Sequence, residues 1–356
     1  MVLIIVTMAL AQSFFREEQV ITPRIVVEKN AGPAIPVNVS FPFQQENITV
    51  SVLVNSSVLQ GARNTDKTVT VIGNVTDAEW VSRTYRAMID DPAQDGVISD
   101  LIGEFRKIRA ARQLSDDEYL ELIALYVQSL QYKTNENTAV KFPVETIADS
   151  AGDCDDKSLL LAALLSREGY DVALLSFRQE NHMALGIGSD DFRYGTTNYT
   201  FLETTNRSFV GIPAQKFGTE TTLVSTPLVI PAGSGQKQYT NTGQTQYISN
   251  VLRDTETKVR ELEPQLEVLS SDLNSRRQEI QDMERGMESL HRAGDIRRYN
   301  QMVLLHNTKV SEYNARLDVY NEVFSRYEKY ALLHNYIIDH PYDRKGVYGH
   351  ILKNLP

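Results

Sequence analysis

The chain has 356 residues and a formal net charge of −10, with 36 Lys and Arg against 46 Asp and Glu. This length predicts two or three folded units, and the acidic balance argues against a basic groove, so no nucleic-acid partner is expected. The single Cys excludes an intramolecular disulfide and a Cys-based zinc site. No run of about 18 apolar residues exists, which excludes a full transmembrane helix.

The first element is the apolar stretch MVLIIVTMALA at residues 1–11. It is too short to span a bilayer and lacks the basic start of a signal peptide, but it ends in Ala9-Leu10-Ala11, which is similar to a signal-peptidase site. We interpret residues 1–23 as a signal or truncated membrane anchor and its lead-in. A buried N-terminal strand is the alternative. The first interpretation predicts an extracytoplasmic protein, secreted or membrane-anchored at the cell surface.

Six Asn-x-Ser/Thr triplets agree with export, because such triplets matter only in a glycosylating compartment. Four of them fall within residues 38–76, where a Ser/Thr/Asn-rich β segment is the alternative explanation. The candidate glycosylation sites are Asn38, Asn47, Asn55, Asn74, Asn198 and Asn206.

Residues 24–76 predict a small β-rich segment, because short β-branched runs alternate there with Asn, Gly and Ser. The runs are Arg24–Glu28, Ile48–Val54, Val58–Leu59 and Thr68–Ile72.

Residues 77–215 predict an α+β domain. Apolar residues recur at three- and four-residue steps in three stretches, and Ser115 followed by acids is typical of a helix start. A fourth helix around Leu159–Leu165 is apolar on all sides and should be buried. Three strands follow it, which indicates an antiparallel sheet. The predicted elements are helices at Ala78–Met88, Val97–Ala111 and Asp116–Leu130, and strands at Asp171–Phe177, His182–Ile187 and Tyr199–Glu203.

Residues 216–245 are rich in Gly, Thr, Ser and Gln and predict a linker. Residues 246–338 carry a heptad pattern in two arms separated by an Arg-Ala-Gly break at 292–294, which predicts a long antiparallel α-helical coiled-coil hairpin. Pro264 should kink the first arm or begin a helix. Aromatic residues and His recur every seven residues from Tyr299; we interpret them as a wide, partly wet seam, with a recognition stripe as the alternative. Residues 339–356 are a C-terminal tail.

The only Cys, Cys154, lies at the start of the apolar helix, where the helix dipole favours a thiolate and the neighbouring Asp residues oppose it. A thiol nucleophile needs a base, and His182 is the only His before position 291. A third group should orient the imidazole. Glu203 at the end of the next strand is the best candidate, and Asp190 and Asp191 are weaker ones.

The segment from about Leu122 to Pro213 resembles the transglutaminase-like core, a fold related to papain. The resemblance covers about a quarter of the chain. The matching pieces are Tyr126-Val127-Gln128-Ser129-Leu130-Gln131-Tyr132, Phe142-Pro143-Val144-Glu145-Thr146, Gly152-Asp153-Cys154-Asp155-Asp156, Gly169-Tyr170-Asp171-Val172, Asn181-His182-Met183-Ala184 and Leu202-Glu203-Thr204-Thr205.

The resemblance implies a catalytic triad of Cys154, His182 and Glu203. The family usually has Asp at the third position, and it often has an aromatic residue shortly after the His, where this chain has Met183 and Ala184. The oxyanion donors would be the Cys154 backbone N–H and, by similarity to papain-like sites, the side chain of Gln128. No Gly-rich phosphate motif or EF-hand loop occurs, and no cofactor or metal is expected.

The resemblance predicts a cysteine enzyme that acts on peptide or isopeptide amides through a thioester, with hydrolysis favoured over cross-linking. Its partner would be a peptide or protein substrate. The alternative is a non-catalytic surface scaffold or adhesion protein, whose hairpin binds a protein partner or self-associates.

Overall fold

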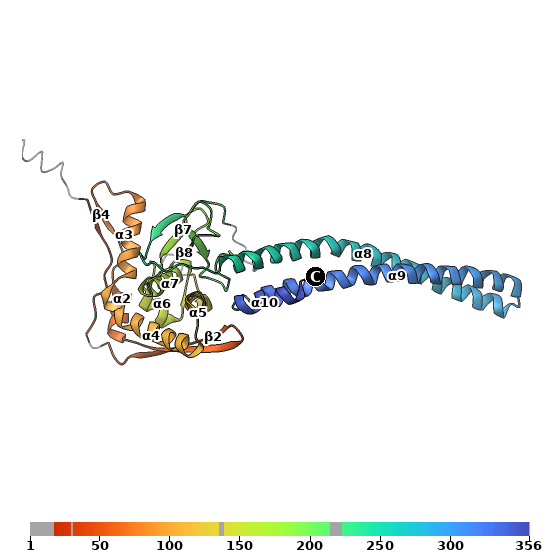
Figure 1. Cartoon of the computed structure of the whole chain (residues 1–356), viewed down its shortest axis with the longest axis horizontal. Coiled ribbons are helices and arrows are strands. Elements are labelled where there is room, and N and C mark those ends of the chain that lie inside the picture. Colours follow the sequence, from red (N-terminus) through yellow and green to blue (C-terminus); the bar gives the residue numbers. More distant parts are fainter. Residues whose placement is uncertain (1–17, 30, 135–138, 214–222, 356) are drawn as a thin grey trace, which may run out of the picture. The chain divides into compact units, whose positions relative to one another are not determined.

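The computed structural model describes residues 18–29, 31–134, 139–213 and 223–355 (Figure 1). The chain divides into two compact units, which we call the core unit (Met1–Gln246 and Pro341–Gly346) and the hairpin unit (Tyr247–His340 and Val347–Pro356). The expected mixed α+β class is confirmed, since the core unit combines helices with small, mostly antiparallel sheets.

The helices of the core unit follow the predicted periodicity. Ser115 caps its helix with a full capping box, in which its side chain accepts from the Glu118 N–H and the Glu118 carboxylate accepts from the Ser115 N–H. The helices are α2 (Ser56–Asn64), α3 (Asp77–Ile89), the short 3₁₀ turn η1 (Pro92–Gln94), α4 (Asp95–Arg112), α5 (Asp116–Ser129), α6 (Pro143–Asp149) and α7 (Cys154–Arg167).

Helix α7 forms the centre of the core unit. Its seven residues Leu159–Leu165 are all completely buried, as expected for a helix that is apolar on every side. It packs against the sheet through β7 (Val172–Phe177) and β8 (His182–Gly188), and against α3, α5 and α6. Burial on all sides fixes the start of α7, and with it Cys154, relative to the strands.

The main sheet has the strand order β10-β7-β8-β9, with all neighbours antiparallel. The strands expected after α7 are confirmed, with β9 at Tyr199–Leu202. Strand β10 (Leu228–Pro231) lies inside the expected linker 216–245, so that prediction was wrong for this part. Its Ile230 fills the core, and the later Tyr239 is also buried, which anchors this Gly- and Thr-rich segment to the domain.

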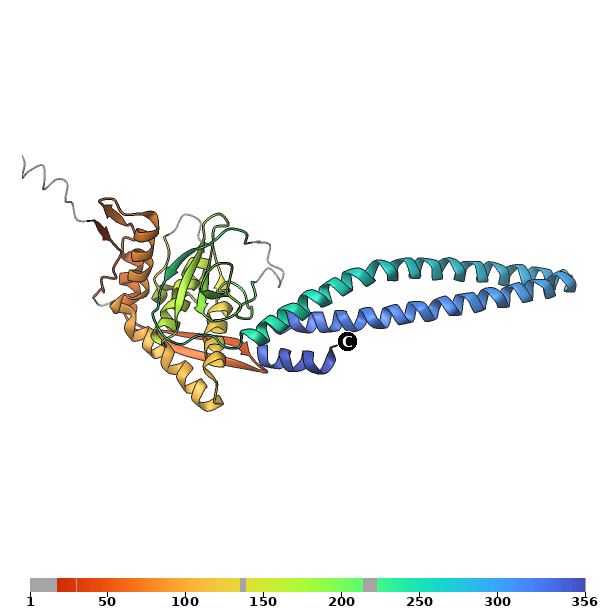
Figure 2. The ribbon, with the colours of Figure 1, turned by 45° about the horizontal axis from the view of Figure 1, so that its top comes forward.

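The N-terminal β-rich segment also belongs to the core unit and is not a separate unit. Strands β2 (Ile35–Phe43) and β3 (Glu46–Val54) form a long hairpin whose alternate residues are buried, and it packs against α4 and α5 (Figure 2). The predicted strand Val58–Leu59 lies in α2, because the Asn55 side chain accepts from the N–H groups of Ser57 and Val58 and starts a helix.

Four short strands complete the core unit. β4 (Thr70–Ile72) confirms the run expected there and pairs with β1 (Gln19–Ile21), whereas Arg24–Glu28 is not a strand. β5 (Gln131–Tyr132) and β6 (Ala151–Gly152) form a parallel pair that joins the end of α5 to the start of α7. This pair places Gln131-Tyr132 beside Gly152, so two of the segments that carry the resemblance lie side by side.

The hairpin unit consists mainly of α8 (Thr242–Arg292) and α9 (Ile296–Asp339), which turn at Gly294 with a positive φ of 72°. Ion pairs Asp272–Arg316 and Glu279–Lys309 show that the helices run antiparallel, as predicted. Helix α8 continues through Pro264, so this residue does not begin a helix.

The seam between the two helices is unevenly buried. Leu262, Leu269 and Leu273 of α8 are buried, while Tyr299 and the seam residues that follow it to Tyr327 are only half-buried. This agrees with a wide seam whose polar tips reach solvent.

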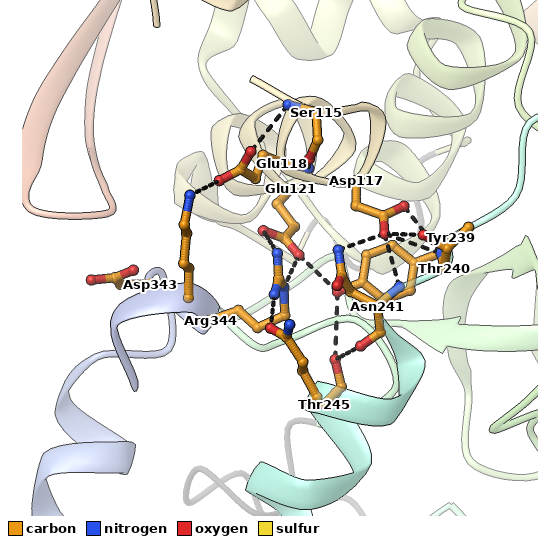
Figure 3. A network of polar contacts seen from close by, with 12 residues as sticks. Ser115, Asp117, Glu118, Glu121, Tyr239, Thr240, Asn241, Thr245, Asp343 and Arg344 are labelled. Carbon is orange, nitrogen blue, oxygen red and sulfur yellow. Dashed lines mark hydrogen bonds and ion pairs between the residues drawn. The ribbon is translucent and has the colours of Figure 1, made fainter. Parts of the chain in front are cut away.

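The segment Pro341–Gly346 belongs to the core unit, although a plain C-terminal tail was expected over 339–356. Arg344 begins α10 (Arg344–Asn354) and forms an ion pair with Glu121 of α5 (Figure 3). Glu121 also accepts from the Tyr239 hydroxyl at 2.7 Å. On the same helix Asp117 accepts the backbone N–H groups of Thr240 and Asn241. These contacts fasten two distant chain segments to α5.

Among the described residues, no helix is both long and apolar enough to cross a membrane. Most of the predicted signal or anchor, residues 1–17, lies outside the described part of the chain.

Candidate active site

Cys154 is the first residue of α7, and its neighbours build the helix start. The Asp153 side chain accepts from the N–H groups of Asp155 and Asp156, and the Asp156 carboxylate accepts from the Asp153 N–H in return. Gly152 is required here, because a Cβ would lie 2.6 Å from Cβ of Asp156. Asp153 and Asp156 therefore cap the start of α7, whereas the sequence had left open whether one of the acids beside the Cys serves as the cap.

The surroundings of the Cys154 thiol favour its protonated form. Burial and the charge of Asp155 raise the pKa of Cys154 to about 12, while a hydrogen bond from the Met183 backbone lowers it. Sγ lies 3.6 Å from Oδ1 of Asp155. The sequence left the direction of this pKa shift open, and the structure favours a protonated thiol at neutral pH.

His182 lies at the beginning of β8, and the thiol of Cys154 contacts the backbone on both sides of it. Sγ is 4.0 Å from the Asn181 carbonyl oxygen and interacts with the Met183 N–H. Asn181 adopts a left-handed conformation with φ of 49°, which ends the turn before the strand. The topology thus brings the only two candidate residues for nucleophile and base to one place.

Glu203 directly follows β9 and contacts His182, with Oε2 at 3.4 Å from Nε2. Its other oxygen, Oε1, accepts from the Thr204 N–H, the Thr205 N–H and the Thr205 hydroxyl at 3.0, 2.9 and 2.7 Å. Burial alone would raise the pKa of Glu203, but the bonds from His182 and Thr205 hold it below its ordinary value. The side chain is therefore a fixed carboxylate that can orient the imidazole.

Asp190 and Asp191, the weaker candidates for the third group, do not take part. Both are exposed and follow the far end of β8, opposite His182. Asp190 faces Arg193 at 3.9 Å.

Gln128 has a different role from the oxyanion donor that the resemblance implied. Its amide nitrogen donates to the carbonyl oxygens of Glu203 and Ser208 at 2.8 and 3.2 Å, and its amide oxygen accepts from the Ser208 N–H. Both amide hydrogens are used, so none remains for an oxyanion. Gln128 instead clamps the segment that carries Glu203 to the end of α5.

The Cys154 backbone N–H is the other oxyanion donor that was expected from the sequence. In the described part of the chain it has no hydrogen-bond partner, as expected for the first residue of a helix. Tyr85 of α3 was missed from the sequence, because it lies outside the segment that carries the resemblance. Its hydroxyl is 3.4 Å from Oδ2 of Asp155, and burial together with the charges of Asp155 and Cys154 raises its pKa, so the hydroxyl stays protonated.

The described residues contain no group of three or more His, Cys, Asp or Glu that could hold a metal ion. The six candidate glycosylation residues are all exposed, and Asn55 also caps α2. Exposure permits a folded chain to carry glycans at these residues but does not test whether it does. Glycosylation therefore stays a prediction, together with export.

The role of Asp155 can be tested by alkylation of Cys154. Replacing Asp155 by Asn removes a negative charge 3.6 Å from Sγ, so the pKa of the thiol should fall and the alkylation rate at pH 7.5 should rise. A fall of about one pKa unit gives roughly tenfold more thiolate. The control is Asp149→Asn, whose carboxylate is paired with Arg63 and Lys141 away from the thiol. An unchanged rate in the Asp155 variant would remove this residue from the electrostatics of the site.

The site is thus assembled from α7, β8 and the end of β9, all within the core unit. It places a buried thiol against the backbone that flanks His182, and the His182 imidazole against the buried carboxylate of Glu203. Comparisons with protein-family models, with curated proteins and with solved structures found no match to this chain.

Proposed function

We propose that the chain is a transglutaminase-like cysteine enzyme that acts on peptide or isopeptide amides through a thioester intermediate. The observation that carries the proposal is that the Cys154 thiol lies beside the chain around His182, whose imidazole contacts the Glu203 carboxylate. Glu203 faces Nε2 of His182 at 3.4 Å, and the thiol lies against the backbone on either side of the His. An acid that occupies Nε2 leaves Nδ1 as the nitrogen available to the thiol.

These positions support the following sequence of steps. His182 accepts the proton of Cys154 while the sulfur bonds to the amide carbon, and Glu203 stabilises the imidazolium that forms. The Cys154 N–H donates to the oxyanion. His182 then returns the proton to the leaving nitrogen as the C–N bond breaks. A water molecule, activated by His182, attacks the thioester and releases the acid, and the sulfur regains its proton.

We further propose hydrolysis over cross-linking and a location outside the cytoplasm. The preference for hydrolysis rests on the resemblance. The location rests on the apolar residues 1–11 and on the exposed Asn-x-Ser/Thr sites. The substrate would be a peptide or a protein.

The test uses the full-length chain with a mixed pool of peptides and mass spectrometry of the products. The parent should cleave some of the peptides, and Cys154→Ala and His182→Ala should each abolish cleavage while remaining folded by circular dichroism. Addition of a small primary amine distinguishes the two outcomes, because a transferase would attach the amine to the acyl product. Equal alkylation of Cys154 in the parent and in His182→Ala, with no cleavage of any peptide, would contradict an enzymatic role.

The second candidate is a scaffold whose hairpin binds a partner or self-associates. It is favoured by Leu304 and Leu305 of α9, which are 72% and 54% exposed. A scaffold of this kind would keep its binding when Cys154 is replaced by Ala.

A further inference from the structure

Lys157 is a completely buried lysine one helical turn after Cys154. Its Nζ donates to the carbonyl oxygens of Gln128, Leu130 and Thr205 at 3.2, 3.0 and 3.1 Å. These three bonds use all the hydrogens of the ammonium group. In the described part of the chain it forms no ion pair, so these carbonyl oxygens offset the cost of burying its ammonium form.

Two of the three carbonyls lie at the end of α5. Gln128 is near its last residue and Leu130 is its C-cap, so both oxygens lack the partner that a continuing helix would provide. A cation is favourable at this end of the helix dipole. Taken alone, these two bonds make Lys157 a cap for α5.

The third carbonyl belongs to the segment that fixes Glu203. Thr205 donates its N–H and its hydroxyl to Oε1 of Glu203, and its own carbonyl accepts from Lys157. A continuous chain of contacts therefore runs from Lys157 through Thr205 and Glu203 to His182. The helix that carries the nucleophile thus also holds the loop that carries the acid.

Lys157 and Glu203 also interact electrostatically. Burial lowers the pKa of Lys157 to about 7, and the charge of Glu203 opposes that shift. Such an interaction is reciprocal: if Glu203 favours the ammonium form of Lys157, then Lys157 favours the carboxylate form of Glu203 by the same free energy. The buried carboxylate is balanced in this way when His182 is neutral.

We propose that Lys157 is a positioning residue for the acid of the site: it tethers the Thr205 segment and supplies the positive charge that balances Glu203. This inference rests on the proposed function, because it assigns Glu203 the task of orienting His182. A role limited to capping α5 is the competing explanation, and it predicts a change in stability alone.

The experiment follows the pH dependence of Cys154 alkylation by a neutral haloacetamide in the full chain. Lys157→Met removes charge and tether, and Lys157→Gln keeps two donors but no charge. Loss of a buried positive charge raises the proton affinity of the groups that face it, so both variants should shift the acid limb of the profile to higher pH by about one unit. Lys141→Met is the matched control, since this largely buried lysine bonds the Ala151 carbonyl and Asp149 instead.

A double-mutant cycle isolates the path through Glu203. In a Glu203→Gln background, at least half of the shift caused by Lys157→Gln should disappear, because the charge that Lys157 balances is gone. Parent-like profiles in both Lys157 variants, with only a lower urea midpoint, would reduce Lys157 to a cap and overturn the inference.

A second measurement applies if both Lys157 variants fail to fold. The Cε signal of Lys157 can be titrated by NMR in the parent and in Glu203→Gln, and its midpoint should be lower in the variant. An identical midpoint would overturn the inference. Neither result depends on substrate, whereas the proposed function is tested separately, by peptide cleavage in the parent and by the effect of His182→Ala on cleavage and alkylation.

Discussion

Replacing Glu203 by Gln should lower the turnover of a cleaved peptide by on the order of 10²-fold without unfolding the chain. Three donors converge on Oε1, so the amide oxygen must take that position. The amide nitrogen then donates to Nε2 of His182 and forces the ring hydrogen onto Nδ1, where it blocks acceptance of the thiol proton. The measurement is kcat together with a circular dichroism spectrum at the same pH.

The change of Glu203 to Asp should give an intermediate loss of turnover. It keeps the charge and restores the residue usual in the resembling family, but it is shorter by one methylene. A shorter side chain cannot both keep the Thr205 bonds and hold the 3.4 Å contact to His182. Asp190→Asn is the control and should match the parent, because Asp190 is exposed at the other end of β8. Parent-like turnover in both Glu203 variants would remove Glu203 from the mechanism.

The helical parts of the fold could be predicted because their signals are local. The start of α5 is encoded by Ser115 and Glu118, and the burial of α7 by an unbroken apolar run. The hairpin of α8 and α9 follows from a heptad repeat, which is the local pattern that helices of a coiled coil share.

The elements that depend on distant contacts could not be predicted in this way. Strand β10 has four residues inside a segment of turn-forming composition, and only its pairing with β7 makes it a strand. Val58 is β-branched and Leu59 is apolar, as in a strand, but the cap at Asn55 places them in a helix.

The site shows the same division between local and distant information. Cys154, His182 and Glu203 could be chosen because each stands at the end of an element in a recognisable order. The roles of Gln128 and Lys157 could not, because both are defined by backbone carbonyls that lie far away in the sequence. Every residue has a backbone carbonyl, so the sequence does not indicate which carbonyls accept these hydrogen bonds.

Replacing Arg344 by Met should lower the free energy of unfolding of the core unit by about 3–5 kcal/mol, because it leaves Glu121 without its ion-pair partner. The side chains of Arg344 and Glu121 are only 4% and 14% exposed, so water cannot replace the lost contact. Lys345→Met is the matched control. The Lys345 side chain is 72% exposed and its pair with Glu118 should contribute at most about 1 kcal/mol. The measurement is urea unfolding of the full chain, followed by the fluorescence of Trp80.

The loss caused by Arg344→Met should depend on pH in a defined direction. Burial already raises the pKa of Glu121 in the folded chain, and Arg344 opposes this. Without Arg344 the folded-state pKa of Glu121 rises further above its unfolded value, so the folded variant binds a proton more tightly than the unfolded one. Protonation therefore stabilises the variant, and its deficit relative to the parent should be largest near pH 8 and shrink towards pH 5. The variant Arg344→Met with Glu121→Gln should recover part of the loss at pH 8, since it buries an amide in place of a charge. A deficit equal to that of Lys345→Met, or one that grows as the pH falls, would show that the Arg344–Glu121 pair does not hold Pro341–Gly346 to α5.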